Sequence, residues 1–134
     1  MKEEWINKII NHDVTKKFPL PDECIDVVIT SPPYFGLRNY GVEDQIGLEK
    51  NPQEYIDKIV GVGQEIKRVL KKSGSFYLNL GDTYKNKNLM GIPWRVTIAL
   101  QEDDGDDIYE MNKNLSKENE KYVLSELKKK GLIL

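Results

Sequence analysis

The sequence has little of what metal-binding, disulfide-stabilised or membrane-spanning proteins need. Its 134 residues include one cysteine, Cys24, and one histidine, His12. An internal disulfide cannot form, and we expect no metal site. No apolar run approaches the roughly 18 residues that cross a bilayer, and the acidic, mixed amino terminus is not a secretory signal. We therefore expect a cytoplasmic protein that does not associate with membranes.

The sequence also lacks a surplus of positive charge. Its 20 Lys and Arg residues are outnumbered by 22 Asp and Glu residues, which gives a formal net charge of −2 at pH 7. A protein that holds nucleic acid by neutralising phosphates normally clusters its basic residues. The composition therefore argues against strong DNA binding by this chain alone.

A short β-branched run is present, and two prolines follow it at once. Residues 25–30, IDVVIT, predict a buried strand. The next residues, Ser-Pro-Pro-Tyr, must leave the strand because prolines cannot continue a β-ladder. The sequence thus predicts a loop at the carboxyl end of a buried strand, where open α/β sheets bind their ligands. Upstream, residues 6–14 predict an edge strand that ends at His12-Asp13.

A helix is predicted after the glycine-punctuated loop at residues 35–50. Asn51 can cap this helix, Pro52 suits its first position, and Glu54 can complete a capping box. Apolar residues then recur near helical spacing as far as Leu70. The pattern indicates a long amphipathic helix.

The end of this helix and a second strand are predicted next. Lys71 and Lys72 suit the negative end of a helix dipole, and Gly74 suits a left-handed cap. Residues 75–80 predict a strand, and the order strand, helix, strand favours a parallel βαβ unit. A further helix is predicted from residue 91 to residue 100.

The tetrapeptide Ser31-Pro32-Pro33-Tyr34 has side chains suited to an exocyclic amine of a nucleobase. Such an amine is a poor nucleophile because its lone pair is delocalised into the ring. Hydrogen bonds from both amine hydrogens to the Ser31 hydroxyl and the Pro32 carbonyl would localise that lone pair. Pro33 would keep the turn rigid, and Tyr34 could stack on a base swung out of the duplex. Alone, the tetrapeptide could equally be a turn or a polyproline ligand for an adaptor domain.

Around this tetrapeptide, the sequence resembles the amino-methyltransferases of bacterial and archaeal restriction-modification systems. The resemblance rests on four segments in the family's order and covers roughly residues 6–105. The segments are residues 30–40 (TSPPYFGLRNY), 44–49 (DQIGLE), 78–84 (LNLGDTY) and 91–96 (GIPWRV). It implies an α/β fold: a partial Rossmann-like, S-adenosylmethionine-dependent methyltransferase fold with a mainly parallel sheet.

The resemblance also implies an activity and a set of site residues. Members transfer a methyl group from S-adenosyl-L-methionine to a flipped base in double-stranded DNA. Serine before Pro-Pro-Tyr is typical of the cytosine-N4 branch, and adenine-N6 is the alternative target. By resemblance, residues 31–34 are catalytic, Asp13 and Asp82 lie near the cofactor, and Arg38 and Tyr40 contact DNA. A solvated strand end would explain Asp13 as well, and a strand-ending turn would explain Asp82.

The sequence departs from the family's pattern in two places. The family's cofactor motif is a glycine turn after a strand, whereas Gly61-Val62-Gly63 lies inside the predicted helix, so we reject it as a cofactor turn. After Gly105 the family's next segments are replaced by an acidic stretch within residues 101–110 and a short charged helix expected at 116–130. We therefore divide the chain into a catalytic-half methyltransferase region, 1–105, and a divergent charged helical tail, 106–134.

Three interpretations stay open. The chain can be a truncated methyltransferase, inactive alone, that needs a second polypeptide to supply the glycine motif and the recognition region. It can be a non-catalytic remnant. It can also be an interaction module that uses its Pro-Pro-Tyr segment as a ligand. Half of a doubly wound sheet would leave an open strand edge, so a homodimer is a further alternative.

Overall fold

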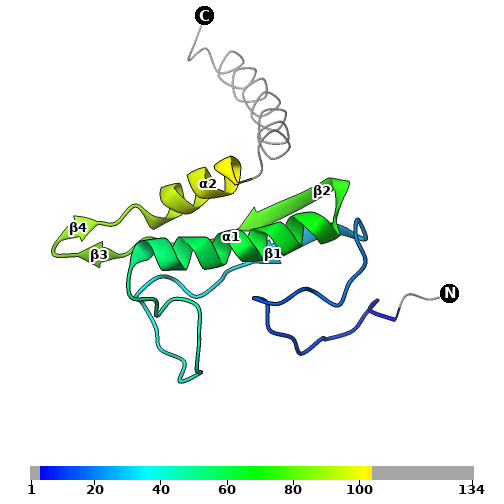
Figure 1. Cartoon of the computed structure of the whole chain (residues 1–134), viewed down its shortest axis with the longest axis horizontal. Coiled ribbons are helices and arrows are strands. Elements are labelled where there is room, and N and C mark those ends of the chain that lie inside the picture. The colour runs from blue at the N-terminus through cyan, green and yellow to red at the C-terminus, as the bar shows by residue number, and fades with distance from the viewer. Residues whose placement is uncertain (1–3, 104–134) are drawn as a thin grey trace, which may run out of the picture. The chain divides into compact units, whose positions relative to one another are not determined.

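The computed structural model describes residues 4–103 of the chain. In these residues the elements follow one another as β1 (Ile25–Thr30), α1 (Pro52–Val69), β2 (Leu70–Leu78), β3 (Tyr84–Lys85), β4 (Asn88–Leu89) and α2 (Ile92–Glu102) (Figure 1). The chain divides into two units, residues 1–99 and 100–134. The helix expected at 116–130 and most of the loop expected at 101–110 lie outside the described residues. None of the helices between residues 4 and 103 has the length and apolar character that crossing a membrane requires.

A parallel βαβ unit forms the centre of the first unit. Strands β1 and β2 pair in parallel, with Ile29 opposite Tyr77 and Thr30 opposite Leu78, and α1 connects them. The Asn79 N–H donates to the Thr30 carbonyl at 2.9 Å, which continues the pairing past the end of β2. The expected βαβ unit is confirmed. The wider Rossmann-like sheet stays a prediction, because two parallel strands are compatible with that fold but do not define it.

The start of α1 follows the capping residues. The Asn51 side chain accepts a hydrogen bond from the Glu54 N–H at 3.0 Å, and Pro52 occupies the first helical position. The Glu54 carboxylate accepts from the Asn51 side-chain amide at 2.9 Å rather than from the Asn51 backbone. The buried face of the helix consists of Tyr55, Ile56, Ile59, Gly63, Ile66 and Val69. The helix is therefore fixed at its start by its cap and along its length by apolar burial.

The end of α1 differs from the expectation. The helix stops at Val69, and Leu70 is already extended, with φ −69° and ψ 136°. Leu70 is buried and pairs with Ile25, so strand pairing draws the chain out of the helix before the two lysines. The prediction that Gly74 caps the helix was wrong. Gly74 lies in β2, where a Cβ would stand 3.1 Å from the Asp26 carbonyl oxygen, so close packing against β1 explains the glycine.

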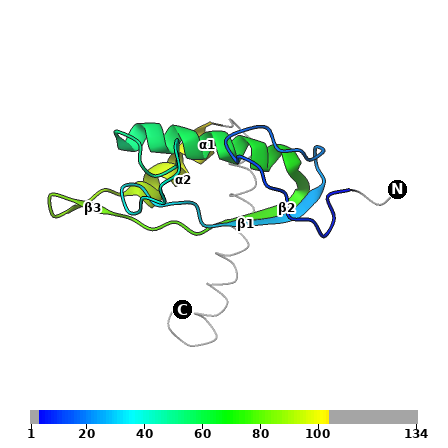
Figure 2. The same cartoon turned by 90° about the horizontal axis from the view of Figure 1, so that it is seen from below.

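Two expectations about strands are corrected. The expected edge strand at residues 6–14 is absent: Ile9 is fully exposed, and Asp13 instead starts a turn by accepting from the Thr15 N–H at 2.9 Å. This side-chain bond competes with strand pairing. The second correction concerns β1, which was expected to be buried. Val27 is 50% and Ile29 77% exposed, because within residues 4–103 only α1 lies along the sheet, on the opposite face (Figure 2).

Arg68 joins the amino-terminal segment to the last turns of α1. Its guanidinium donates to the Phe18 carbonyl at 3.0 Å, to the Leu20 carbonyl at 2.9 Å and to Asp22 at 2.6 Å. It also pairs with Glu65 at 2.9 Å, and Glu65 accepts from the Phe18 N–H at 2.8 Å. The hydrogen bond from Arg68, helped by that from Phe18, lowers the pKa of Glu65 to about 2. This network connects residues far apart in the sequence.

The lowered pKa predicts a pH dependence of stability. Because the folded-state pKa of Glu65 is about 2, below its ordinary value of 4.5, its contribution is present above pH 4.5 and is lost as pH falls toward 2. The free energy of unfolding of the Glu65→Gln variant should therefore fall less across this window. Urea titrations at pH 2.5 to 6 would measure it, as approximate bounds of the linkage window. Glu43→Gln, in the exposed loop, is the matched control; if Glu65→Gln keeps the wild-type pH dependence, the network does not contribute.

Candidate active site at the end of the first strand

The tetrapeptide Ser31–Tyr34 directly follows β1, at the carboxyl edge of the parallel sheet. Its place in a loop after the strand confirms the expectation. Ser31 is exposed, and Pro32, Pro33 and Tyr34 are half-buried. Because the strands are parallel, the residues that follow β2 come to the same edge, and they include Gly81 and Asp82. We call residues 31–34 the diproline corner.

Tyr55 of α1 anchors the diproline corner. Its hydroxyl donates to the Pro33 carbonyl at 2.9 Å, its side chain is fully buried, and its ring lies 5.6 Å from that of Phe35. Burial raises the pKa of the Tyr55 hydroxyl, with smaller contributions from Glu49 and Tyr34, so it stays a protonated donor. Sequence reasoning counted Tyr55 only as an apolar helix position. The missed signal was the hydroxyl itself, since a buried tyrosine needs a partner for its O–H.

Two glycines close around the corner from either side. The Tyr34 ring lies against Gly81, where a Cβ would stand 2.5 Å from the ring's Cε2 atom. Gly47 has a φ of +105°, and a Cβ there would stand 2.9 Å from the Tyr34 carbonyl oxygen. The Gly36 N–H donates to the Gly47 carbonyl at 2.7 Å, which joins the two ends of the loop between them. This packing argues against the interaction-module interpretation, because a polyproline ligand must be free to leave its own domain.

Two oxygens of the corner stay available. Among the described residues, neither the Ser31 hydroxyl nor the Pro32 carbonyl has a hydrogen-bond partner. The Pro33 carbonyl, in contrast, is taken by Tyr55. The arrangement can therefore accept two hydrogen bonds on the exposed side of the corner while its buried side is held in place.

The loop after the corner carries Arg38 and Tyr40, and both side chains are exposed. Gln45 fixes the backbone of both residues: its amide nitrogen donates to the Arg38 carbonyl at 2.8 Å, and its oxygen accepts from the Tyr40 N–H at 2.7 Å. The two predicted DNA-contact residues are thus held on one ordered loop. Their contact with DNA stays a prediction.

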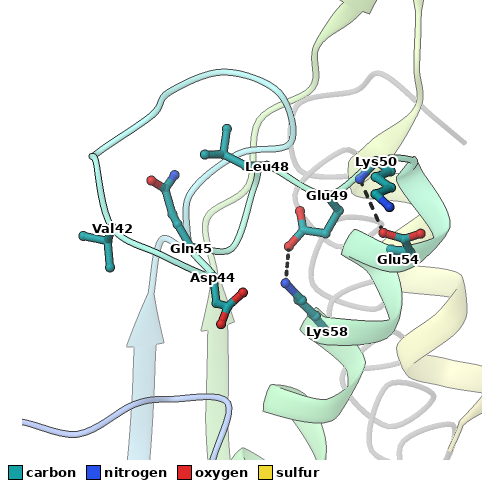
Figure 3. A pocket seen from close by; sticks show the side chains of 8 residues that line it. All are labelled: Val42, Asp44, Gln45, Leu48, Glu49, Lys50, Glu54 and Lys58. Atoms are coloured by element: carbon teal, nitrogen blue, oxygen red, sulfur yellow. Dashed lines mark hydrogen bonds and ion pairs between the residues drawn. The ribbon is translucent and has the colours of Figure 1, made fainter.

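Glu49 connects this loop to α1. Its side chain is buried, with Oε1 3.1 Å from Lys58 Nζ and Oε2 accepting from the Gly47 N–H at 2.9 Å. Figure 3 shows this pair in an open pocket of about 280 Å³ between the loop and the start of α1. The geometry of Oε1 fits an ion pair with Lys58 better than a hydrogen bond. Glu49 thereby holds Gly47 against the diproline corner, so the pocket has a structural explanation.

Asp82 and Asp13 have local roles in the structure. Asp82 accepts from the N–H groups of Thr83 at 2.8 Å, Gly91 at 2.8 Å and Ile92 at 3.0 Å, so it caps the start of α2. Asp13 accepts from Thr15, a bond that lowers the pKa of its carboxyl group. The structure brings Asp82 next to the corner. Asp13 belongs to the amino-terminal segment, which Arg68 holds at the other end of α1 from Tyr55.

Comparisons with known proteins agree with this geometry. The DNA methylase family of the N6/N4 class matches residues 25–129. The chain belongs to this family. The range includes the diproline corner, the βαβ unit and most of the segment from residue 106 onward. Two alternatives from the sequence, adenine-N6 and cytosine-N4 transfer, both fall within this class.

Several type II methyltransferases are similar to this chain. M.XycI from Xanthomonas campestris pv. cyanopsidis is 39% identical, in a match that covers 63% of this chain and 38% of the relative. M.Cfr9I from Citrobacter freundii is 36% identical, with the same shares. M.SfiI from Streptomyces fimbriatus is 40% identical over 63% of this chain and 24% of the relative. The chain thus spans about two fifths or less of their length. No solved structure gave a significant match.

The carboxylates predicted to lie near the cofactor have backbone partners in the described residues. Both carboxylate oxygens of Asp82 are used by backbone N–H groups of the α2 start, and Asp13 is bonded to Thr15. Gly61 and Gly63 lie within α1, as the sequence predicted. Within residues 4–103, no three His, Cys, Asp or Glu side chains are grouped to hold a metal ion. The cofactor contacts of Asp13 and Asp82 stay predictions.

The anchoring of the corner gives a stability prediction. The Tyr55→Phe variant should lower the free energy of unfolding by about 1–2 kcal/mol, because it leaves the half-buried Pro33 carbonyl without its donor. Tyr84→Phe is the matched control, since Tyr84 is 72% exposed and should be close to neutral. Urea unfolding followed by tryptophan fluorescence measures both. Equal effects of the two substitutions would contradict the anchoring role.

Proposed function

We propose that this chain forms the target-base side of an S-adenosylmethionine-dependent DNA methyltransferase of a restriction-modification system. The observation that carries the proposal is the diproline corner at the carboxyl edge of a parallel sheet. There, among residues 4–103, the Ser31 hydroxyl and the Pro32 carbonyl have no hydrogen-bond partner, while Tyr55 holds the Pro33 carbonyl. Membership of the DNA methylase family supports it.

The corner's own residues would bind and orient a flipped base. The Ser31 hydroxyl and the Pro32 carbonyl would accept the two hydrogens of the exocyclic amine. These bonds favour the pyramidal, nucleophilic form of the nitrogen, in which charge develops during attack. Tyr34, whose ring is held by Gly81, would stack on the base. Arg38 and Tyr40, on the exposed loop, would contact the DNA around it.

Cytosine N4 is the proposed target. The support is Ser31 itself, because serine before Pro-Pro-Tyr is typical of the cytosine-N4 branch that the sequence resembles. Adenine N6 is the alternative. The methylated nucleoside recovered from the product distinguishes the two.

We further propose that a second polypeptide segment supplies what this chain does not span. The matched relatives are more than twice as long as their matched region. The face of the sheet opposite α1 exposes Val27, Ile29 and Tyr77, whereas parallel sheets are normally covered on both faces. The rest of a methyltransferase, including its cofactor site, would dock on this face. The chain alone would not transfer methyl groups.

Reconstitution tests the proposed activity. The full chain, co-expressed with the part of M.XycI beyond its match, should transfer labelled methyl groups from S-adenosylmethionine to duplex DNA. Neither polypeptide alone should do so. Ser31→Ala should lower the rate about 100-fold, because one of two aligned hydrogen bonds is lost, whereas Ser73→Ala, also exposed, should not. Methyl transfer by the chain alone would contradict the need for a partner, and an unchanged rate for Ser31→Ala would contradict the site.

The docking face gives a separate prediction. Ile29→Asp should abolish association with the complementary polypeptide, because it places a charge at the centre of an apolar contact. Val42→Asp is the matched control, since Val42 is 64% exposed but lies in the loop after the corner. Analytical ultracentrifugation measures both. Self-association of the chain that Ile29→Asp removes would show a homodimer instead and would contradict the proposed occupant.

A further inference from the structure

The hairpin of β3 and β4, residues 84–89 (YKNKNL), carries two lysines and no acidic residue. All six residues are exposed. Tyr84 pairs with Leu89 and Lys85 with Asn88, which leaves Asn86 and Lys87 as a two-residue turn. Both turn residues have positive φ, +52° and +65°, as a type I′ turn requires. The turn therefore presents the two lysines at the tip of the hairpin.

The root of the hairpin is fixed beside the diproline corner. Asp82 bonds the N–H groups of Thr83 on one side of the hairpin and Gly91 on the other. The Met90 N–H adds a bond to the Thr83 carbonyl at 3.0 Å. Gly81, the residue before Asp82, contacts the Tyr34 ring. The hairpin thus begins three residues after a glycine that contacts the corner, and Figures 1 and 2 show it extending beyond the end of the sheet.

Lys87 occupies a position that its backbone does not favour. The second residue of a type I′ turn is usually glycine, because only glycine adopts positive φ without steric cost. The Lys87 side chain is exposed at the tip of the hairpin. An ammonium group on a flexible stem is a general partner for phosphate.

We propose that the β3–β4 hairpin binds the DNA phosphate backbone next to the flipped base, through Lys85 and Lys87. This inference rests on the proposed function, because it takes its ligand from the base bound at the corner. The formal net charge of −2 gives the chain no overall positive charge that would attract DNA. Local positive groups near the corner are then the candidates for phosphate contact, and the hairpin supplies two. Such contacts set the position of the duplex without reading its sequence.

Salt dependence of DNA binding tests the hairpin. The full chain is titrated with a fluorescent duplex of about 30 base pairs, a length that covers one interface, at several low KCl concentrations. Each phosphate contact adds about 0.9 to the slope of log K against log salt. The double variant Lys85→Gln, Lys87→Gln should therefore lower the slope by about 1.8. The double variant Lys17→Gln, Lys72→Gln removes the same charge at the opposite end of α1 and should keep the wild-type slope.

Lys87→Gly separates charge from folding. Glycine suits the type I′ turn, so this variant should unfold at no lower temperature than the wild type. It should still lose about 0.9 of the slope, since one phosphate contact is removed. Wild-type binding by Lys87→Gly, or equal losses in the two double variants, would overturn the hairpin proposal. So would undetectable DNA binding by the wild type at the lowest salt.

The proposed function is judged by a different measurement. Ser31→Ala should bind DNA with the wild-type slope, because Ser31 contacts the base amine and not the phosphates, but it should fail in reconstituted methyl transfer. If the lysine variants keep the wild-type slope while Ser31→Ala still fails in methyl transfer, only the hairpin proposal is overturned. Absence of the Ser31 effect, with the hairpin's slope change intact, would overturn the corner as the catalytic site and leave the hairpin as a DNA contact.

Discussion

The hydrogen bond from the Tyr55 hydroxyl to the Pro33 carbonyl ties the diproline corner to the buried face of α1. The tyrosine is fully buried on α1, and the carbonyl belongs to the turn that ends β1. Burial keeps the hydroxyl protonated, and the prolines keep the turn rigid, so neither partner can adapt to loss of the other. The position of the Ser31 hydroxyl and the Pro32 carbonyl therefore depends on the packing of the helix.

The sheet shows how much of the fold this chain specifies by itself. One helix covers one face, and the apolar side chains on the other face are exposed within residues 4–103. A parallel pair of strands is stable in proteins mainly because both faces are covered. The face of the sheet is exposed, and the match spans only 38% of the length of M.XycI. Both observations agree with a domain whose second layer comes from additional polypeptide. Folding and activity would then be linked, since the same contact would complete both.

Features that depend on neighbouring residues could be predicted from the sequence. Features that depend on contacts between distant residues could not. The start of α1 was predicted because Asn51 caps it through neighbouring atoms. Its end was missed because Leu70 pairs with Ile25, a contact that no local signal encodes. The diproline corner was predictable because prolines stop a strand, but its anchor Tyr55 looked like any apolar helix residue. Asp82 was noticed for a cofactor role, while its bonds to the start of α2 depend on how the chain returns after the hairpin.

The site contains two kinds of residue: glycines with no space for a side chain, at positions 47 and 81, and exposed residues such as Ser31. Any side chain at Gly81 would collide with the Tyr34 ring, and one at Gly47 would meet both an unfavourable backbone angle and the Tyr34 carbonyl. Ser31, by contrast, is exposed. Substitutions at this site should therefore be least tolerated at Gly47 and Gly81, which have no side chain that could contact a base. Loss of activity in a variant of Gly47 or Gly81 would therefore report on folding of the corner. Loss of activity in a variant of Ser31 would report on catalysis, because the substitution causes no steric clash.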